Sequence, residues 1–322
     1  MRHLDSKPWQ YSVPGGSFEC REQAPLAKLT TFRVGGNADY LALPKTPEQL
    51  NAALSWARSK GLPVTLLGAG SNLLISDRGL PGLVICTRAL RHSEFDATTG
   101  RVIAAAGEPW SSLAWKAARQ GLKGFEWTIG IPGTVGGAVV MNAGAHGSET
   151  ADILVEATVF SPDGTQKILK PADLGYRYRT SVLQGSDAIV TSAIFQLRPG
   201  YDPAEIKAAT ASDLKQRRAT QPYHLPNCGS VFRNPKPHSA GHLIEQAGLK
   251  GYQIGQAQVS TLHANFIVNL GGAQASEVHA LIRHIQRTID ERHDIQLETE
   301  VKIIGDFDCA QPPDFDSAQL PG

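Results

Sequence analysis

The sequence predicts an α+β protein made of two lobes and a smaller C-terminal unit. Three observations support this prediction: strand and helix signals alternate in the first third of the chain, strands outnumber helices in the second third, and new helix caps follow a break at Arg198-Pro199-Gly200. A chain of 322 residues is long enough for about two or three domains with a ligand site between them.

The first lobe is expected over residues 21–88. It follows a lead at 1–20 that we expect to be flexible, because Pro, Gly, Ser and charged residues mix there without periodicity. The clearest element is a helix that starts with the capping box Thr46-Pro47-Glu48-Gln49 and stops at Gly61. Apolar runs predict strands at 64–67 and 82–86. These elements favour a βαβ-like lobe.

The second lobe, over residues 89–200, is predicted to hold more strands than helices. Its expected elements are strands at 102–106, 153–160 and 188–197 and a helix at 111–120. A glycine-dense stretch at 129–147 lies between them and is too apolar to be a linker. Glycine permits positive φ and lets a ligand approach the main chain, so this stretch favours ligand binding. A glycine-rich β-corner without a ligand is the alternative.

The C-terminal unit is expected over residues 201–306. Asp202-Pro203-Ala204-Glu205 carries both signals of a helix start. The further elements expected are a short helix at 243–247, a strand at 264–269, a long amphipathic helix at 276–292 and a strand at 295–304. Alternation along the last strand places Glu298 and Glu300 on the same face. Residues 307–322 are acidic and Pro-rich, which predicts a disordered tail.

Composition and charge exclude several classes of function. The formal net charge is +1 and no basic stripe is interleaved with aromatic residues, so no nucleic acid partner is expected. Cysteines stand at Cys20, Cys86, Cys228 and Cys309 without a C-x-x-C pair, which predicts neither a disulfide framework nor a zinc knuckle. The N-terminus lacks the apolar core of a signal peptide, and no run approaches the roughly 18 apolar residues of a membrane span. We therefore expect a cytoplasmic protein without membrane contact.

Two glycine-containing loops suggest that the ligand is a dinucleotide. Gly68-Ala69-Gly70-Ser71-Asn72 follows a predicted strand, but Leu73 stands where a Rossmann fingerprint has its third glycine. The same residues suit an anion-binding turn, in which successive N–H groups and the side chains of Ser71 and Asn72 bind a pyrophosphate. The second glycine stretch follows about 60 residues later. Two ordinary turns are the alternative.

Two further segments could carry chemistry. Tyr176-Arg177-Tyr178-Arg179-Thr180-Ser181 offers guanidinium groups for bidentate recognition of a carboxylate, or else forms a solvated edge strand. Ser230, within Asn227–Pro235, is either a turn former or a proton donor that needs a charged partner. His238, His242 and His263 have no third ligand at a suitable spacing, so we expect them to be structural and expect no metal site.

Seven motifs, taken in order, resemble the UDP-N-acetylenolpyruvoylglucosamine reductase family, over about residues 29–305. They are Thr31–Gly36, Leu67–Asn72, Ile131–Gly137, Asn142–Ala145, Tyr178–Ser181, Gly229–Pro235 and Leu297–Val301. The resemblance implies a two-lobed FAD-binding domain of the vanillyl-alcohol-oxidase (PCMH) type and a smaller α+β substrate domain. It also implies that hydride passes from NADPH through FAD to the enolpyruvyl ether of a UDP-sugar. The product, UDP-N-acetylmuramate, is used for peptidoglycan synthesis, and so for cell-wall biogenesis, cell shape and cell division.

The resemblance assigns three catalytic residues. Arg179 matches the arginine that stabilises negative charge on the substrate carboxylate, with Arg177 as the fallback. Ser230 matches the donor of a proton to carbon. Glu300 matches a glutamate that binds the substrate carboxyl group or relays a proton, with Glu298 as the fallback.

The resemblance also assigns ligand contacts. The FAD-binding residues expected are Gly68, Ala69, Gly70, Ser71, Asn72, Leu73, Ile131, Pro132, Gly133, Thr134, Gly136, Gly137, Asn142, Gly144 and Ala145. The substrate contacts expected are Tyr178, Arg217 and Asn234. Thr220 stands where many members have a lysine, so Arg217 or Arg218 is expected to take the diphosphate contact. We expect a monomer.

Two features leave alternatives open. The stretches after Ser181 and His238 are short, which indicates the short form of the family without an inserted tyrosine loop. A flavin oxidase of the same superfamily would share the glycine loops, with His146 as a candidate covalent tether. A flavin- or nucleotide-binding module without catalytic activity is the third reading.

Overall fold

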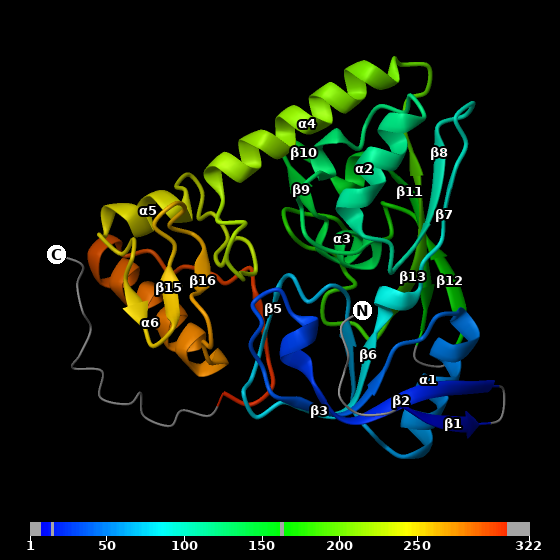
Figure 1. Ribbon diagram of the computed structural model, residues 1–322, viewed down its shortest axis with the longest axis horizontal. Coiled ribbons are helices and arrows are strands. Elements are labelled where there is room, and N and C mark those ends of the chain that lie inside the picture. The colour runs from blue at the N-terminus through cyan, green and yellow to red at the C-terminus, as the bar shows by residue number, and fades with distance from the viewer. Residues whose placement is uncertain (1–7, 14–15, 162–163, 308–322) are drawn as a thin grey trace.

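The structure is a computed structural model that describes residues 8–13, 16–161 and 164–307. Three groups of elements surround a central region, and the C-terminal unit lies to one side of the two lobes (Figure 1). Helix α4 (Pro203–Thr220) runs from the second lobe toward the C-terminal unit along one side of the molecule. No helix in the described ranges combines the length and apolarity that crossing a bilayer requires.

The first lobe is a five-stranded sheet with strand order β1-β2-β3-β6-β4. Its strands are β1 (Trp9–Val13), β2 (Gly16–Pro25), β3 (Asn37–Ala42), β4 (Val64–Leu67) and β6 (Leu80–Cys86). Helix α1 (Pro47–Ser59) covers the sheet. It starts where predicted, because the Thr46 hydroxyl accepts a hydrogen bond from the Gln49 N–H at 3.3 Å and Pro47 occupies the first turn.

The predicted flexible lead is wrong for the part of it that the structure describes. Residues 9–13 and 16–20 pair as an antiparallel hairpin, with Trp9 opposite Cys20. Phe18 and Cys20 are fully buried and pack in the core cluster that includes Trp56 of α1. Alternate side chains of β2 thus face the helix. In the sequence this alternation is too short to distinguish a strand from a loop. Residues 1–7 of the lead and 308–322 of the tail lie outside the described residues.

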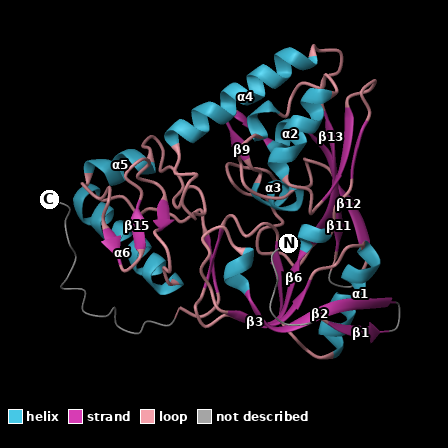
Figure 2. Ribbon diagram, viewed as in Figure 1, coloured by secondary structure: helices cyan, strands magenta, loops and turns pink. Residues whose placement is uncertain are grey.

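The second lobe is an antiparallel sheet with strand order β12-β11-β13-β8-β7 (Figure 2). Its strands are β7 (Ser93–Phe95), β8 (Arg101–Ala105), β11 (Leu154–Phe160), β12 (Gln166–Leu169) and β13 (Ile189–Gln196). Helices α2 (Trp110–Arg119) and α3 (Val135–Met141) pack with this sheet. A small hairpin, β9 (Gly144–Ala145) and β10 (Ser148–Glu149), follows α3. The predicted glycine stretch therefore contains a helix and a hairpin.

The C-terminal unit combines α5 (Ala240–Gln246) and α6 (Ala275–His293) with a small sheet. That sheet contains β14 (Gln253–Ile254), β15 (Ala257–Val259) and β16 (Ile267–Asn269). The apolar stripe predicted for the long helix is buried as expected: Val278, Leu281, Ile282, Ile285 and Ile289 are all 0% exposed.

The predicted last strand is only partly formed. Residues 302–304 form β17 (Lys302–Ile304), which pairs in parallel with β5 (Leu73–Ile75) of the first lobe. Residues 298–301 instead cross the segment 231–233: the Arg233 N–H donates to the Glu298 carbonyl, and the Glu300 N–H donates to the Val231 carbonyl. The two glutamates consequently differ in burial, with side chains 74% exposed for Glu298 and 16% for Glu300.

Candidate active site

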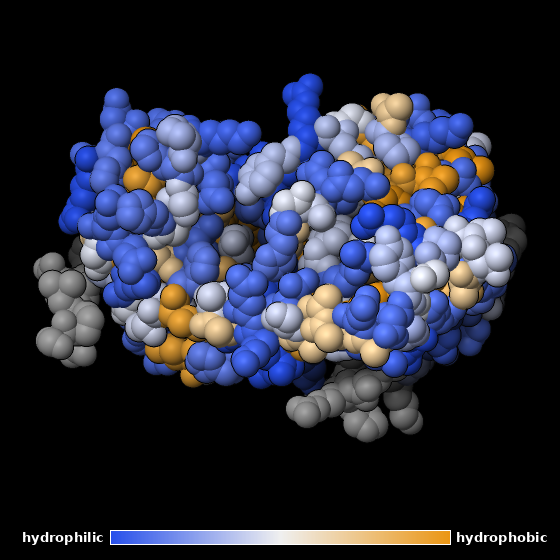
Figure 3. All heavy atoms as spheres, turned by 90° about the horizontal axis from the view of Figure 1, so that it is seen from above, coloured by the Kyte–Doolittle hydropathy of each residue, from blue (hydrophilic) through white to orange (hydrophobic). Residues whose placement is uncertain are grey.

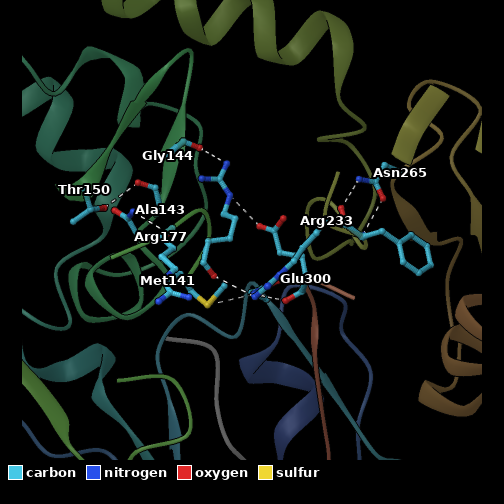
Figure 4. A network of polar contacts seen from close by, with 12 residues as sticks. Met141, Ala143, Gly144, Thr150, Arg177, Arg233, Asn265 and Glu300 are labelled. Carbon is cyan, nitrogen blue, oxygen red and sulfur yellow. Dashed lines mark hydrogen bonds and ion pairs between the residues drawn. The ribbon is translucent and has the colours of Figure 1, made fainter. Parts of the chain in front are cut away.

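An ion pair between Arg179 and Glu300 stands at the centre of the candidate site (Figure 4). The Arg179 Nε lies 3.2 Å from the Glu300 Oε1, and the side chains are 21% and 16% exposed. The Arg179 Nη2 donates a second hydrogen bond, of 2.6 Å, to the Gly144 carbonyl. The guanidinium is thus held from two sides, which leaves its Nη1 as the end without a described partner. Arg179 and Glu300 come from sequence segments far apart, and the structure brings their side chains into contact.

A tight turn presents Arg179. Arg177 and Thr180 exchange two backbone hydrogen bonds of 3.1 Å, and Arg179 within this turn has φ of 55°. The Gln184 side chain donates to the Arg179 carbonyl at 2.9 Å, and the Ser181 hydroxyl donates to the Val140 carbonyl at 2.6 Å. A left-handed conformation at a non-glycine residue is strained, and surrounding contacts must hold it.

Burial and charge act in opposite directions on Glu300. Burial raises the pKa of its carboxyl group above the ordinary value, while the Arg179 and Arg233 guanidinium groups lower it; the effect of burial is the larger. The backbone of Glu300 is fixed through its N–H to the Val231 carbonyl at 2.8 Å and through its carbonyl, which accepts from the Asn72 side chain at 3.0 Å.

Ser230 lies in a loop that is held before it by the Gly229 N–H, which donates to the Asn227 side chain at 2.9 Å, and after it by contacts of Val231 and Phe232. The Asn265 side chain accepts from the Phe232 N–H at 2.9 Å and donates to the Phe232 carbonyl at 2.8 Å (Figure 4). The Val231 carbonyl accepts from the Glu300 N–H, which places the residue that follows Ser230 next to the glutamate. Ser230 is half-buried, and its hydroxyl donates to no group in the described ranges.

Arg233 is a site residue that sequence reasoning did not assign. Its Nη2 lies 3.4 Å from the Arg179 carbonyl and its Nη1 lies 3.6 Å from the Glu298 Oε2, while its Nε is buried without a partner among the described residues. Its charge, after burial, also lowers the pKa of Lys302. The arginine in the Gly229–Pro235 motif was the available signal for this role. Strand alternation places Glu298 and Glu300 on the same face, so it could not say which of the two lies beside Arg233.

The first glycine loop has its carbonyl groups engaged and its N–H groups free. The Arg88 guanidinium donates to the carbonyls of Gly68, Ala69 and Leu29, and the Thr31 N–H donates to the Gly70 carbonyl. No described residue accepts a hydrogen bond from the N–H groups of residues 69–72. Such a row of free N–H groups is a cradle for phosphate oxygens, so the loop fits the pyrophosphate of FAD. Arg88 had no signal in the sequence.

The two glycine loops touch, as a shared ligand requires. The Ser71 hydroxyl donates to the Pro132 carbonyl at 2.9 Å. A Cβ atom on Gly68 would lie 2.8 Å from the Thr134 hydroxyl, which itself caps α3. The other predicted cofactor residues of the second loop lie in the turn before α3 (Ile131, Gly133), in α3 (Gly136, Gly137) and in β9 (Gly144, Ala145). Leu73 begins β5.

Asn142 is fully buried and links the second glycine loop to the arginine turn. Its Nδ2 donates to the Arg177 carbonyl at 3.2 Å and its Oδ1 accepts from the Ala151 N–H at 3.0 Å. His146, the candidate flavin tether, occupies the turn between β9 and β10 with φ of 52°.

The predicted substrate contacts lie in three different places. Tyr178 is 45% exposed, with its ring 5.1 Å from the Arg179 guanidinium carbon. Arg217 is 8% exposed, lies beneath Gly130 of the second glycine loop, and has a buried Nε without a partner in the described chain. The Asn234 side chain accepts from the Ala240 N–H at 3.0 Å at the start of α5.

A cavity of about 440 Å³ adjoins Ser230 and the second glycine loop. Gly229 and Pro132 are part of its wall, which also carries Lys28, Arg33, Arg88 and His224 and no acidic residue. The face seen from above is mostly hydrophilic and is hollowed near its middle (Figure 3). A cavity with positive wall charge suits an anionic ligand. No cluster of three His, Cys, Asp or Glu side chains suited to a metal ion occurs in the described part of the chain.

Comparisons with known proteins agree on one family. Residues 38–170 match an FAD binding domain family, and residues 221–304 match the C-terminal domain of UDP-N-acetylenolpyruvoylglucosamine reductase. The chain is 60% identical over 298 residues to the UDP-N-acetylenolpyruvoylglucosamine reductase of Trichormus variabilis, covering 92% of this chain and 90% of that protein. It is 51% identical over 295 residues to that of Acaryochloris marina, covering 92% and 96%. The crystal structure of the reductase (MurB) from Thermus caldophilus is similar with a TM-score of 0.75 at 37% identity, covering 92% of this chain and 99% of that one.

Proposed function

The chain belongs to the UDP-N-acetylenolpyruvoylglucosamine reductase family, and from this premise we propose how its own residues carry out the reaction. The protein is an FAD-dependent oxidoreductase, UDP-N-acetylmuramate dehydrogenase, which acts in peptidoglycan precursor synthesis with NADPH as donor. The observation that carries the proposed mechanism is the Arg179–Glu300 pair, in contact at 3.2 Å although its members are far apart in sequence.

We propose that the two glycine loops hold FAD, through residues 68–73 on one side and 131–137 and 142–145 on the other. When bound, FAD takes a hydride from NADPH and supplies it to the substrate. The free N–H groups of residues 69–72 support a pyrophosphate contact at the first loop. Arg88 keeps these N–H groups available, because it binds the carbonyl groups from the other side.

Arg179 binds the carboxylate of the enolpyruvyl group. Addition of hydride to the terminal vinyl carbon leaves negative charge on the neighbouring carbon and on this carboxylate. A guanidinium fixed by Glu300 and Gly144 needs no reorganisation to stabilise that charge, an effect of roughly 3–4 kcal/mol for a comparable fixed donor. Arg177 contributes through its backbone to the turn that presents Arg179.

Ser230 gives its hydroxyl proton to the carbon that carries the negative charge. Serine is a weak acid, so the proton needs cationic surroundings and a source that replaces it. Glu300 lies next to the Ser230 segment, and its pKa is raised by burial, which suits a carboxyl group that passes protons on. The reaction balances as one hydride from NADPH and one proton through Ser230, which together saturate the double bond.

The proposed substrate contacts are Tyr178, Arg217 and Asn234. Exposure of Tyr178 beside Arg179 supports a contact with the UDP-sugar, and the unpartnered Nε of Arg217 supports a contact with an anionic ligand. Asn234 has its oxygen bound to α5 and retains only its NH₂ group for a ligand. We further propose a cytoplasmic location, since UDP-sugars and NADPH are cytoplasmic metabolites. We also propose that the protein is a monomer and that its activity supports cell shape and division.

We propose the division into an FAD-binding domain at 21–200, with lobes at 21–88 and 89–200, and a substrate domain at 201–306. Core clusters centred on each of these three ranges support it, with Phe32, Val34 and Leu74 of the first lobe joining the C-terminal cluster and Leu90 and Ile189 of the second lobe joining a first-lobe cluster. Family membership favours the reductase over the covalent oxidase.

Replacement of Ser230 tests the mechanism. In Ser230→Ala we expect normal bleaching of the flavin by NADPH but very slow reoxidation by the enolpyruvyl UDP-sugar, because only the second half-reaction needs the proton. Anaerobic stopped-flow absorbance separates the two steps. Equal loss in both half-reactions would remove Ser230 from the role of proton donor.

A further inference from the structure

The side chain of Asn72 does not face the phosphate cradle. Asn72 belongs to the first glycine loop, yet its Nδ2 donates to the carbonyl of Glu300 at 3.0 Å and lies 3.8 Å from the Met141 sulfur (Figure 4). The carbonyl of Asn72 accepts from the Lys302 N–H, also at 3.0 Å. Asn72 of the first glycine loop, which we also call the cofactor loop, is therefore hydrogen-bonded to the residues on both sides of Val301.

These contacts extend a strand ladder by one step. The parallel pairing of β5 with β17 begins at Leu73 opposite Lys302. Before that point the two chains no longer run as paired strands, and the Asn72 amide replaces the missing backbone donor for the Glu300 carbonyl. The amide and the ladder thus connect the first glycine loop directly to Glu300 and the strand that follows it.

The other end of Glu300 is the catalytic contact. Its carboxylate meets the Arg179 Nε at 3.2 Å, and its N–H meets the Val231 carbonyl beside Ser230 at 2.8 Å. The backbone of Glu300 thus has one hydrogen bond toward the proton-donor loop and one toward the cofactor loop. A shift of the Glu300 backbone therefore moves its carboxylate away from Arg179.

We infer that Asn72 is a positioning residue that couples occupancy of the cofactor loop to the placement of Glu300, and that its side chain is not a cofactor ligand. This inference rests on the proposed role of Glu300. Phosphate oxygens bind the N–H groups of the loop and fix the loop's conformation. Because the Asn72 amide is bonded to the Glu300 carbonyl, a fixed loop also fixes the backbone position of Glu300.

Asn72→Ala tests the inference on the full-length holoenzyme. We expect the rate of flavin bleaching by NADPH to stay at the wild-type value, because the N–H cradle is intact, and FAD binding to weaken only by the small factor that the lost coupling contributes. Reoxidation by the enolpyruvyl UDP-sugar is expected to slow by about 10- to 100-fold, the range for a misplaced catalytic group. In hydrogen–deuterium exchange, FAD is expected to protect residues 298–303 in the wild type and to protect them much less in the variant.

Asn269→Ala is the matched control, because Asn269 also donates an amide hydrogen bond across the molecule, to the Phe32 carbonyl at 2.9 Å. It is expected to lower the Tm without separating the two half-reactions and with normal FAD protection of residues 298–303. Weakened FAD binding in Asn72→Ala with unchanged reoxidation would make Asn72 a cofactor ligand and overturn the inference. Wild-type protein that is not reoxidised by the UDP-sugar would instead refute the proposed function.

Discussion

At the scale of the residue, Gly144 sets the position of Arg179, the arginine to which we assign the catalytic role. Its carbonyl accepts from Arg179, and its hydrogen atom faces the same guanidinium: a Cβ at this position would lie 3.0 Å from the Arg179 Nη1 and 2.6 Å from the Ser148 carbonyl oxygen. A side chain here must displace either the hairpin or Arg179. The absence of a side chain is therefore a requirement of the site and not only of the turn.

We predict that Gly144→Ala slows reoxidation of the flavin by the UDP-sugar by about 10- to 100-fold, with reduction by NADPH unchanged. Gly147→Ala in the same hairpin is the control. Gly147 has φ of 78°, so alanine strains the turn, but no atom lies within 4 Å of the added Cβ. Stopped-flow absorbance should show slow reoxidation with normal reduction in Gly144→Ala alone. The same slow reoxidation in both variants would attribute the effect to hairpin strain.

Glu300 makes stability depend on pH in a specific direction. Burial raises its pKa in the folded state above the ordinary 4.5, so the folded protein binds this proton more tightly than the unfolded chain does. The resulting stability is fully present below pH 4.5 and is lost as the pH rises through the raised pKa. We predict that the wild type loses free energy of unfolding relative to Glu300→Gln over this rise, measured by urea denaturation at several pH values. A relative gain would mean that the ion pair with Arg179 outweighs burial.

At the scale of the element, helix α6 is capped by a residue of the other end of the chain. The two carboxylate oxygens of Asp77 accept from the N–H groups of Ala275 and Ser276, each at 2.8 Å. Gln274 and Glu277 complete the helix start with a capping box. A cap supplied from the first lobe ties α6 to that lobe as well as satisfying its free donors.

We predict that Asp77→Ala lowers the free energy of unfolding by about 1 kcal/mol, as for the loss of a helix cap. Asp77→Asn retains one acceptor oxygen and should lose less. Thermal or urea unfolding measures both, and equal losses in the two variants would show that a single remaining acceptor oxygen contributes nothing to the cap.

The sequence predicted elements where local signals suffice. The capping box at Thr46, the Asp202-Pro203 helix start and the apolar stripe of α6 are patterns within one segment, and each matches a helix of the structure. The β1–β2 hairpin and the break at residues 295–301 were missed because their form depends on distant partners, the α1 core and the 231–233 segment. Arg88 and Arg233 were missed for the same reason: each acts through backbone carbonyls or carboxylates that only the fold brings near.

At the scale of the whole molecule, the predicted family, fold class and cofactor are confirmed, and these are the properties that ordered motifs specify best. The packing between units was not predictable from motifs. The core cluster of the C-terminal unit includes Phe32, Val34 and Leu74 from the first lobe, each at most 2% exposed. Three polar links accompany it: the β5–β17 ladder, the Asp77 cap and the Asn269 contact with Phe32.

These shared contacts predict that the C-terminal unit does not fold alone. A fragment of residues 201–307 would lose Phe32, Val34 and Leu74 from its core cluster and would lose the strand partner of β17. We expect this fragment to lack a cooperative thermal transition in circular dichroism. The full chain, in contrast, should unfold its C-terminal unit together with the first lobe.

Phe32→Ala in the full chain tests the same coupling without truncation. Phe32 is 0% exposed, so its loss is expected to destabilise by about 3–5 kcal/mol, although the residue belongs to the first lobe. Hydrogen–deuterium exchange should then rise in α6 as strongly as in the first-lobe sheet. Faster exchange confined to the first lobe, or a folded 201–307 fragment, would show that the units are independent. The active site would then form only when two separately folded units dock. Shared packing of Phe32 instead makes the Glu300 segment and the first glycine loop parts of one folded unit.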